Sequence, residues 1–117
     1  DNAIDKTGMN IKDTMYILSG ASFFIGTSSG LSWLSWAMGV PVILVSGMSL
    51  PIFEFQSNCV HVNNSEVCNG CLNDPTYEFD RGDWLYCPRH KDGAEQFICT
   101  KSITPQMVMD AVSKITG

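Results

Sequence analysis

Apolar residues in the first part of the chain follow two different spacings. Ile11, Met15 and Leu18 are spaced i, i+4 and i+7, which predicts a helix that begins after an Asn10 cap. The continuous apolar run 22–26 follows, and such a run is typical of a strand buried on both faces. The chain therefore begins with a predicted helix and a predicted strand.

The same succession then repeats. Leu31, Leu34 and Met38 share one helical face and Gly39 follows as a stop, so a second helix is predicted here. The apolar run 41–45 predicts a second buried strand. Helices that alternate with strands form a parallel sheet with right-handed crossovers, and the pattern therefore predicts an α/β fold.

The second half of the chain is mostly polar. The short run 59–62 predicts a third strand, whereas 63–97 is rich in turn residues and predicts no regular structure. Thr104 is a suitable helix cap and Pro105 suits the first helical position, so a closing helix is predicted. Its apolar face consists of Val108, Ala111, Val112 and Ile115.

Length and charge narrow the classes of function. The 117 residues suffice for one compact domain. A net charge of -5 with only seven Lys and Arg argues against a nucleic-acid surface or an anionic-membrane patch, because both need clustered cations. No apolar run is long enough for a membrane span. The chain does not begin with Met, and we expect it to be a piece of a longer protein.

A turn of small residues lies between the first predicted strand and the second predicted helix. It reads Gly26, Thr27, Ser28, Ser29 and Gly30. Ligands of open parallel sheets bind at the carboxyl ends of the strands, and a helix start offers unpaired N–H groups that suit phosphate. The turn is therefore a candidate diphosphate site, and a plain helix cap is the alternative. The motif is neither G-x-G-x-x-G nor a P-loop.

The five cysteines raise a second question of chemistry. Their odd number, without a visible secretion signal, favours reduced thiols over a disulfide framework. Cys68 and Cys71 form a C-x2-C pair that suits two ligands of a tetrahedral ion, and Cys87 and Cys99 would complete a four-thiolate site for zinc or iron. The spacing C-x2-C-x15-C-x2-H makes His90 a rival fourth ligand. Unrelated reduced thiols remain the alternative.

Two further features lie near the candidate turn. Trp33 and Trp36 are three residues apart on the second helix, where a core or interface role is more usual than stacking on a base or sugar. The loop 47–51 follows the second strand and should lie near the same crevice. Glu54, just beyond it, could bond ribose hydroxyls, but we expect a solvated carboxylate.

The stretch FFIGTSSGLSWLSWAMGVPVILVSG resembles the nucleotide-sugar half of GT-B glycosyltransferases, and more narrowly the bacterial autotransporter heptosyltransferases. The runs FDRGDWLYCPRH and FICTKSITPQMVMDAV and the cysteine positions strengthen this resemblance. It implies that residues 1–117 are a C-terminal Rossmann-like donor-binding domain that contains a metal finger over 59–99. The ligands would be Cys68, Cys71, Cys87 and Cys99, and the ion would be iron by resemblance or zinc by ligand chemistry.

The resemblance also implies an activity and partners. The whole enzyme would transfer heptose from an ADP-heptose donor to serines of an autotransporter, in the bacterial cytoplasm and as a homo-oligomer. A separate N-terminal domain would supply the catalytic base. The donor would be held by Thr27, Ser28, Ser29, Gly30 and Leu31. Related lipopolysaccharide enzymes carry Asp and His around this turn, so here backbone N–H groups must contribute more.

Two other functions fit the same sequence. One is a non-catalytic, metal-stabilised module for protein interaction, with the finger and the two tryptophans as its surface. The other is a GT-B transferase that uses another nucleotide sugar, such as a UDP-sugar.

Overall fold

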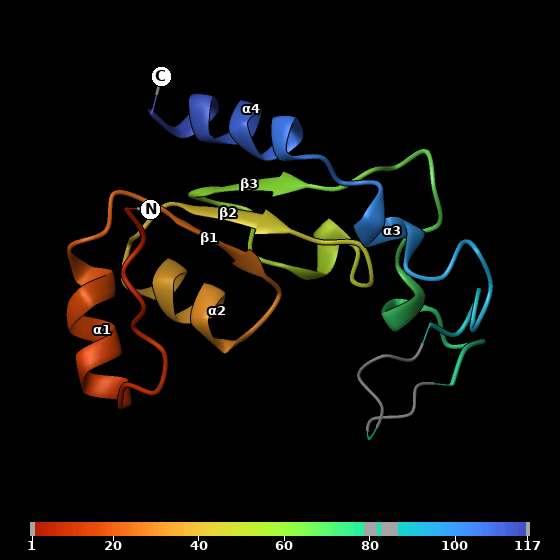
Figure 1. Ribbon diagram of the computed structural model, residues 1–117, viewed down its shortest axis with the longest axis horizontal. Coiled ribbons are helices and arrows are strands. Elements are labelled where there is room, and N and C mark those ends of the chain that lie inside the picture. Colours follow the sequence, from red (N-terminus) through yellow and green to blue (C-terminus); the bar gives the residue numbers. More distant parts are fainter. Residues whose placement is uncertain (1, 79–81, 83–86, 117) are drawn as a thin grey trace.

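The computed structural model describes residues 2–78, 82 and 87–116 of the chain. The run FDRGDWLYCPRH (79–90), on which the resemblance partly rests, lies outside the described residues at 79–81 and 83–86. Helices and strands alternate in the first half, as the pattern predicted (Figure 1). The elements in order are α1 (Ile11–Ser19), β1 (Phe24–Thr27), α2 (Gly30–Ala37), β2 (Val42–Val45), the 3₁₀ turn η1 (Pro51–Phe53), β3 (Cys59–Val62), the 3₁₀ turn η2 (Cys71–Asn73), α3 (Ile98–Lys101) and α4 (Pro105–Thr116).

The three strands form one parallel sheet in the order β1-β2-β3. Val45, the last residue of β2, pairs with Thr27 of β1 and with Val62 of β3. All three strands therefore end at one edge of the sheet, and their following loops emerge there. The predicted parallel sheet and its third strand are confirmed.

Helices cover both faces of this sheet. Figure 1 shows α4 on one face and α2 on the other. On the α2 face, Val42, Leu44 and Phe55 form a buried cluster against which Trp36 packs. Neighbouring side chains of a strand point to opposite faces, so Ile43 faces the α4 side. There it packs with Val62, Ala111 and apolar residues of α4, including the predicted Val108, Val112 and Ile115.

The helix ends follow from local side-chain chemistry. Asn10 accepts the N–H of Asp13 through its side-chain oxygen at 2.9 Å, which confirms the predicted cap of α1. Thr104 Oγ1 likewise accepts the N–H of Met107 at 3.3 Å at the start of α4. Gly39, just past α2, has a φ of 80°, a value that glycine adopts without strain.

The prediction that the first strand is buried on both faces is wrong, and the first helix is also poorly covered. Ile25 of β1 is 44% exposed, although the apolar run 22–26 predicted a strand buried on both faces. None of the residues of α1 is buried, and Ile11 is 61% exposed. An apolar pattern shows which face of an element needs cover, but the described part of this chain does not cover these two faces.

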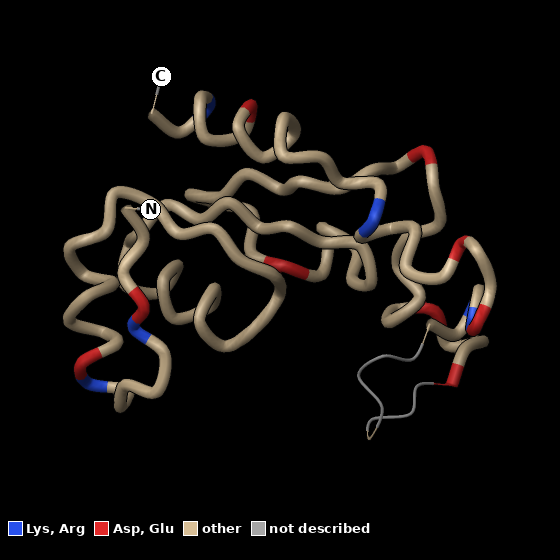
Figure 2. The backbone as a smooth tube through the Cα atoms, viewed as in Figure 1, with Lys and Arg blue, Asp and Glu red and all other residues tan. Residues whose placement is uncertain are grey.

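Charged residues are few over the sheet. Figure 2 shows them mainly along the N-terminal segment with α1 and, at the other end of the molecule, among the described residues of 63–101, here called the cysteine-rich region. No helix in the described residues is long and apolar enough to cross a bilayer.

Candidate functional site

The turn from Thr27 to Leu31 connects β1 to α2 at the edge where the strands end. All five of its residues are exposed. Ser29 is the N-cap of α2 and has an extended backbone. The first N–H groups of a helix lack partners within the helix and carry its positive dipole end. The turn is thus open to an anion from solvent, as a diphosphate site requires.

A buried hydroxyl holds this turn in shape. Ser32 is fully buried, and its Oγ accepts the N–H of Ser29 at 3.0 Å and lies 2.7 Å from the carbonyl oxygen of Thr27. Sequence reasoning missed Ser32. The Ser-x-x-Ser spacing of Ser29 and Ser32 is the signal that could have identified it, because it resembles a capping box.

Glu54 lies next to this turn, and the expectation that its carboxylate is solvated is wrong. The residue is only 8% exposed, and Ser28 Oγ donates to Glu54 Oε1 at 2.6 Å. Because this bond engages the Ser28 hydroxyl proton, backbone N–H groups of the turn are the better donors to an anion. Glu54 also joins the loop after β2 to the turn after β1.

The loop after β2 connects the same edge to the cysteine-rich region. The N–H of Gly70 donates to Gly47 O at 2.8 Å, and the N–H of Leu72 donates to Met48 O at 3.0 Å. The N–H of Leu50 donates to Asn73 Oδ1 at 2.7 Å. The C-x2-C segment is therefore bound to the backbone at the carboxyl end of β2.

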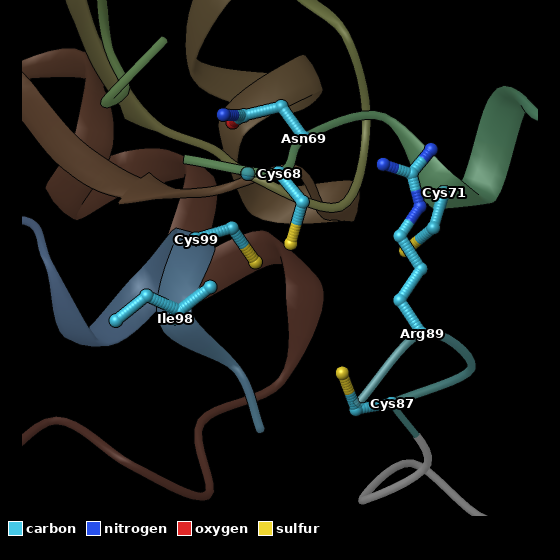
Figure 3. Close-up of a pocket in the computed structure, with 8 residues that line it drawn as sticks. Cys68, Asn69, Cys71, Cys87, Arg89, Ile98 and Cys99 are labelled. Carbon is cyan, nitrogen blue, oxygen red and sulfur yellow. The ribbon is translucent and has the colours of Figure 1, made fainter. Parts of the chain in front are cut away.

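Four cysteines come together in one small pocket beside this loop. Cys68 and Cys71 come from the C-x2-C segment, Cys87 from the segment before α3, and Cys99 from α3 itself. Figure 3 shows their sulfur atoms facing the space between them. All are free thiols, and Cys71, Cys87 and Cys99 are buried.

Glycines permit this close packing. A Cβ on Gly47 would lie 2.8 Å from Cys99 Cβ and 3.1 Å from its Sγ. Gly70 has a φ of 77°, and this left-handed turn brings Cys71 into the pocket beside Cys68.

The thiols affect one another electrostatically. Burial, and then the neighbouring Cys99 thiol, raise the pKa of both Cys68 and Cys71. Arg89 lines the same pocket and acts in the opposite direction on both pKa values. Cys59 stands apart on β3, where burial is the main cause that raises its pKa.

The donor chemistry of the pocket suits a thiolate-binding metal ion, since four sulfurs from three segments of the chain face one space. Within residues 2–78, 82 and 87–116, however, no group of three or more His, Cys, Asp and Glu side chains is arranged to hold an ion as it stands. The four sulfurs would have to draw together to bind one. Among the described residues, Cys99 lines the pocket and His90 does not; His90 Nδ1 lies 3.5 Å from Glu95 Oε2.

The two tryptophans pack against each other at the α2 face. Their ring centroids are 5.9 Å apart and nearly perpendicular, and Trp36 stacks on Phe55. Trp36 Nε1 donates to Ser57 O at 2.9 Å, while Trp33 is 42% exposed. Trp36 therefore packs against the core cluster and is half-buried, whereas Trp33 is exposed.

Comparison with known sequences gives several relatives, although no family model matches. The chain is 48% identical to the autotransporter heptosyltransferase BAHTCr of Citrobacter rodentium and 46% identical to TibC of Escherichia coli, over 97% of this chain in both cases. The resemblance to autotransporter heptosyltransferases is confirmed. The chain spans 28% of the length of each of these two relatives.

Solved structures of an autotransporter heptosyltransferase agree. A crystal structure of TibC, described as a dodecameric iron-containing heptosyltransferase in complex with ADP-D-beta-D-heptose, matches 90% of this chain with a TM-score of 0.82 and 46% identity. A second TibC structure, from enterotoxigenic E. coli, matches 93% with a TM-score of 0.85. This chain covers 28% of each of those chains. The α/β architecture with its parallel sheet is therefore shared.

Similarity to the autotransporter heptosyltransferases does not by itself establish activity. The chain is also 39% identical, over 86% of its length, to a protein of Burkholderia thailandensis named as the inactive autotransporter heptosyltransferase BimC. Sequence similarity at this level thus extends to a protein without the activity.

Proposed function

We propose that residues 1–117 are the C-terminal donor-binding domain of a protein O-heptosyltransferase. The whole enzyme transfers heptose from ADP-heptose to serines of an autotransporter protein. The observation that carries the proposal is the exposed turn 27–31 at the carboxyl edge of a sheet whose TibC counterpart was solved with ADP-D-beta-D-heptose. A separate N-terminal domain supplies the acceptor site and the catalytic base.

The chemistry proposed for this domain is electrostatic. Negative charge builds on the departing ADP as the bond to the sugar breaks. N–H groups that already point at the diphosphate stabilise this charge without reorganising, and they are worth more where water is excluded. Gly30 and Leu31 begin α2 and present these groups, while Ser32, which accepts the N–H of Ser29, and Glu54 keep the turn in place from behind.

The four-cysteine pocket is proposed as the site of one structural metal ion. Cys68, Cys71, Cys87 and Cys99 would hold it, with iron supported by the description of TibC and zinc by ligand chemistry. A thiolate-bound ion would stabilise loops that bury few apolar side chains. Elemental analysis of protein purified without added metal tests this proposal. One iron or zinc per chain supports it, and metal-free protein with four reactive thiols at these positions contradicts it.

Calorimetry with ADP tests the donor site. We expect saturable binding to the whole protein that carries this sequence, and loss of that binding in Ser29→Trp, because the indole would fill the exposed turn. Ser113→Trp is the matched control, since Ser113 is exposed on α4. Competition by UDP as strong as by ADP would indicate another nucleotide sugar.

A non-catalytic interaction module is the second candidate, and the inactive relative BimC is the observation that favours it. In that case the cysteine-rich loops and Trp33 form a protein-binding surface. No heat at millimolar ADP, with a fully folded protein, would support this module over the transferase. For the transferase we also propose a homo-oligomer, which the dodecameric description of TibC supports, and a cytoplasmic location.

A further inference from the structure

Arg89 is the charged residue of the cysteine pocket. Besides the four cysteines, the described residues that line the pocket are Gly47, Asn69, Ile98 and Arg89. Of these eight residues only Arg89 has a cationic side chain. Figure 3 shows its side chain running alongside Cys71. Sequence reasoning did not assign it a role, although it lies two residues after Cys87.

Two contacts orient the guanidinium from outside the pocket. Arg89 Nη2 lies 3.3 Å from Asp74 Oδ2, and its Cζ lies 5.0 Å from the centre of the Tyr77 ring. Both partners belong to the segment that follows Cys71. The arginine thus links the segment that carries Cys87 to the segment that carries Cys71.

These outer contacts do not account for the whole side chain. Nε of Arg89 is buried and has no hydrogen-bond partner among the described residues. An unpaired N–H in such a place is costly. The pair with Asp74 is about a quarter to a third exposed, and pairs of that kind contribute little by themselves. The buried Nε–H is therefore available to a group bound in the pocket that Arg89 lines.

Thiolate ligands around a divalent cation provide such a partner. Four thiolates exceed the charge of the cation, so the centre as a whole is negative and costly to bury. A fixed guanidinium offsets part of that charge, and its N–H can donate to a ligating sulfur, which is a charge-assisted hydrogen bond.

We propose that Arg89 is a positioning residue of the metal site: its guanidinium, oriented by Asp74 and Tyr77, balances the charge of the thiolate centre and donates Nε–H to one of its sulfurs. This proposal rests on the metal site proposed above. Its chemistry does not depend on whether the ion is iron or zinc, because either ion leaves the centre negative.

Zinc transfer from the whole protein to a chromogenic chelator tests the role of Arg89. Outer contacts to metal ligands commonly contribute about 10- to 100-fold to metal affinity, so Arg89→Gln should lose zinc about 10- to 100-fold faster than the native protein. Arg89→Lys keeps the charge but lacks Nε–H, and it should lie between the two. Lys12→Gln removes the same charge from exposed α1 and should lose zinc at the native rate.

A second measurement separates this role from a structural one. If Arg89 acts on the ion, the metal-free Arg89→Gln protein should unfold at the same temperature as metal-free Lys12→Gln. Equal zinc loss from these two variants overturns the proposal but leaves the metal site in place. Native protein that binds neither zinc nor iron overturns both. If Arg89→Gln does not fold, native-rate zinc loss from Arg89→Lys overturns the proposal.

Discussion

Gly70 has a backbone conformation that other residues adopt only with strain. Its φ is 77°, and a Cβ there would lie 2.6 Å from Cγ and Cδ2 of Leu50. Gly8 has nearly the same φ, 78°, but a Cβ there would meet nothing within 4 Å. A comparison of alanine substitutions at these two glycines therefore separates the cost of backbone strain from the cost of a steric clash with Leu50.

We expect Gly70→Ala to lower the free energy of unfolding by about 2 to 5 kcal/mol, from left-handed strain and overpacking together. Gly8→Ala carries the strain alone and should cost about 2 kcal/mol or less. Urea denaturation of both variants measures the difference. Equal losses would mean that Leu50 moves away freely, and that the segment around Gly70 is not held against the loop after β2.

Single residues also show where sequence reasoning succeeds and fails. The Asn10 and Thr104 caps could be predicted because capping depends on neighbours within a few residues. The burial of Glu54 could not, since its partner Ser28 lies 26 positions earlier and meets it only after the sheet has formed. The pocket position of Arg89 depends in the same way on long-range contacts.

At the scale of elements, α1 and α4 have similar caps but different surroundings. The α4 face packs on the sheet through Ala111 and its neighbours, whereas none of the residues of α1 is buried. Loss of a cap affects global stability only when the helix unfolds together with the core. The same chemical change should therefore have different consequences at the two helices.

Thr104→Ala should lower the free energy of global unfolding by about 1 kcal/mol, because it removes the acceptor of the Met107 N–H. Asn10→Ala removes an equivalent bond at α1 and should leave global unfolding nearly unchanged. Its effect should be seen in faster hydrogen exchange of α1 amides alone. A global loss of similar size in both variants would show that α1 belongs to the cooperative core.

The elements themselves could be predicted well, and their environments less so. Apolar patterns predicted α1, α2, α4 and all three strands, because each pattern lies within a few residues of the chain. They did not predict the exposure of Ile25 or of the α1 face, since these depend on what lies beyond the element. The chain spans 28% of the length of BAHTCr and of TibC, so the pattern within it cannot show what packs on these faces in a longer protein.

Over the whole molecule, two regions are held together by different forces. The sheet and the helices on its two faces bury continuous apolar clusters around Val42, Ile43 and Leu44. The cysteine-rich region contributes mainly Cys71, Cys87 and Cys99 to the buried apolar set. Sequence spacing predicted Cys68, Cys71 and Cys87 as candidate metal ligands and left Cys99 and His90 as alternatives for the fourth. It did not predict that the four cysteines meet beside the loop after β2.

Removal of the proposed metal ion should therefore affect the two regions unequally. After treatment with a chelator under reducing conditions, we expect hydrogen exchange to accelerate in 67–78 and 87–101, because ligation supplies order that few apolar contacts can replace. Amides of β2, which is buried between two helical layers, should keep their protection. The backbone hydrogen bonds from Gly70 and Leu72 to the loop after β2 are the route by which a loss of protection would spread to the sheet.

Equal loss of protection in β2 would show that the cysteine pocket is part of the core. Unchanged exchange throughout, in protein shown to have released its ion, would mean that the loops are ordered without it.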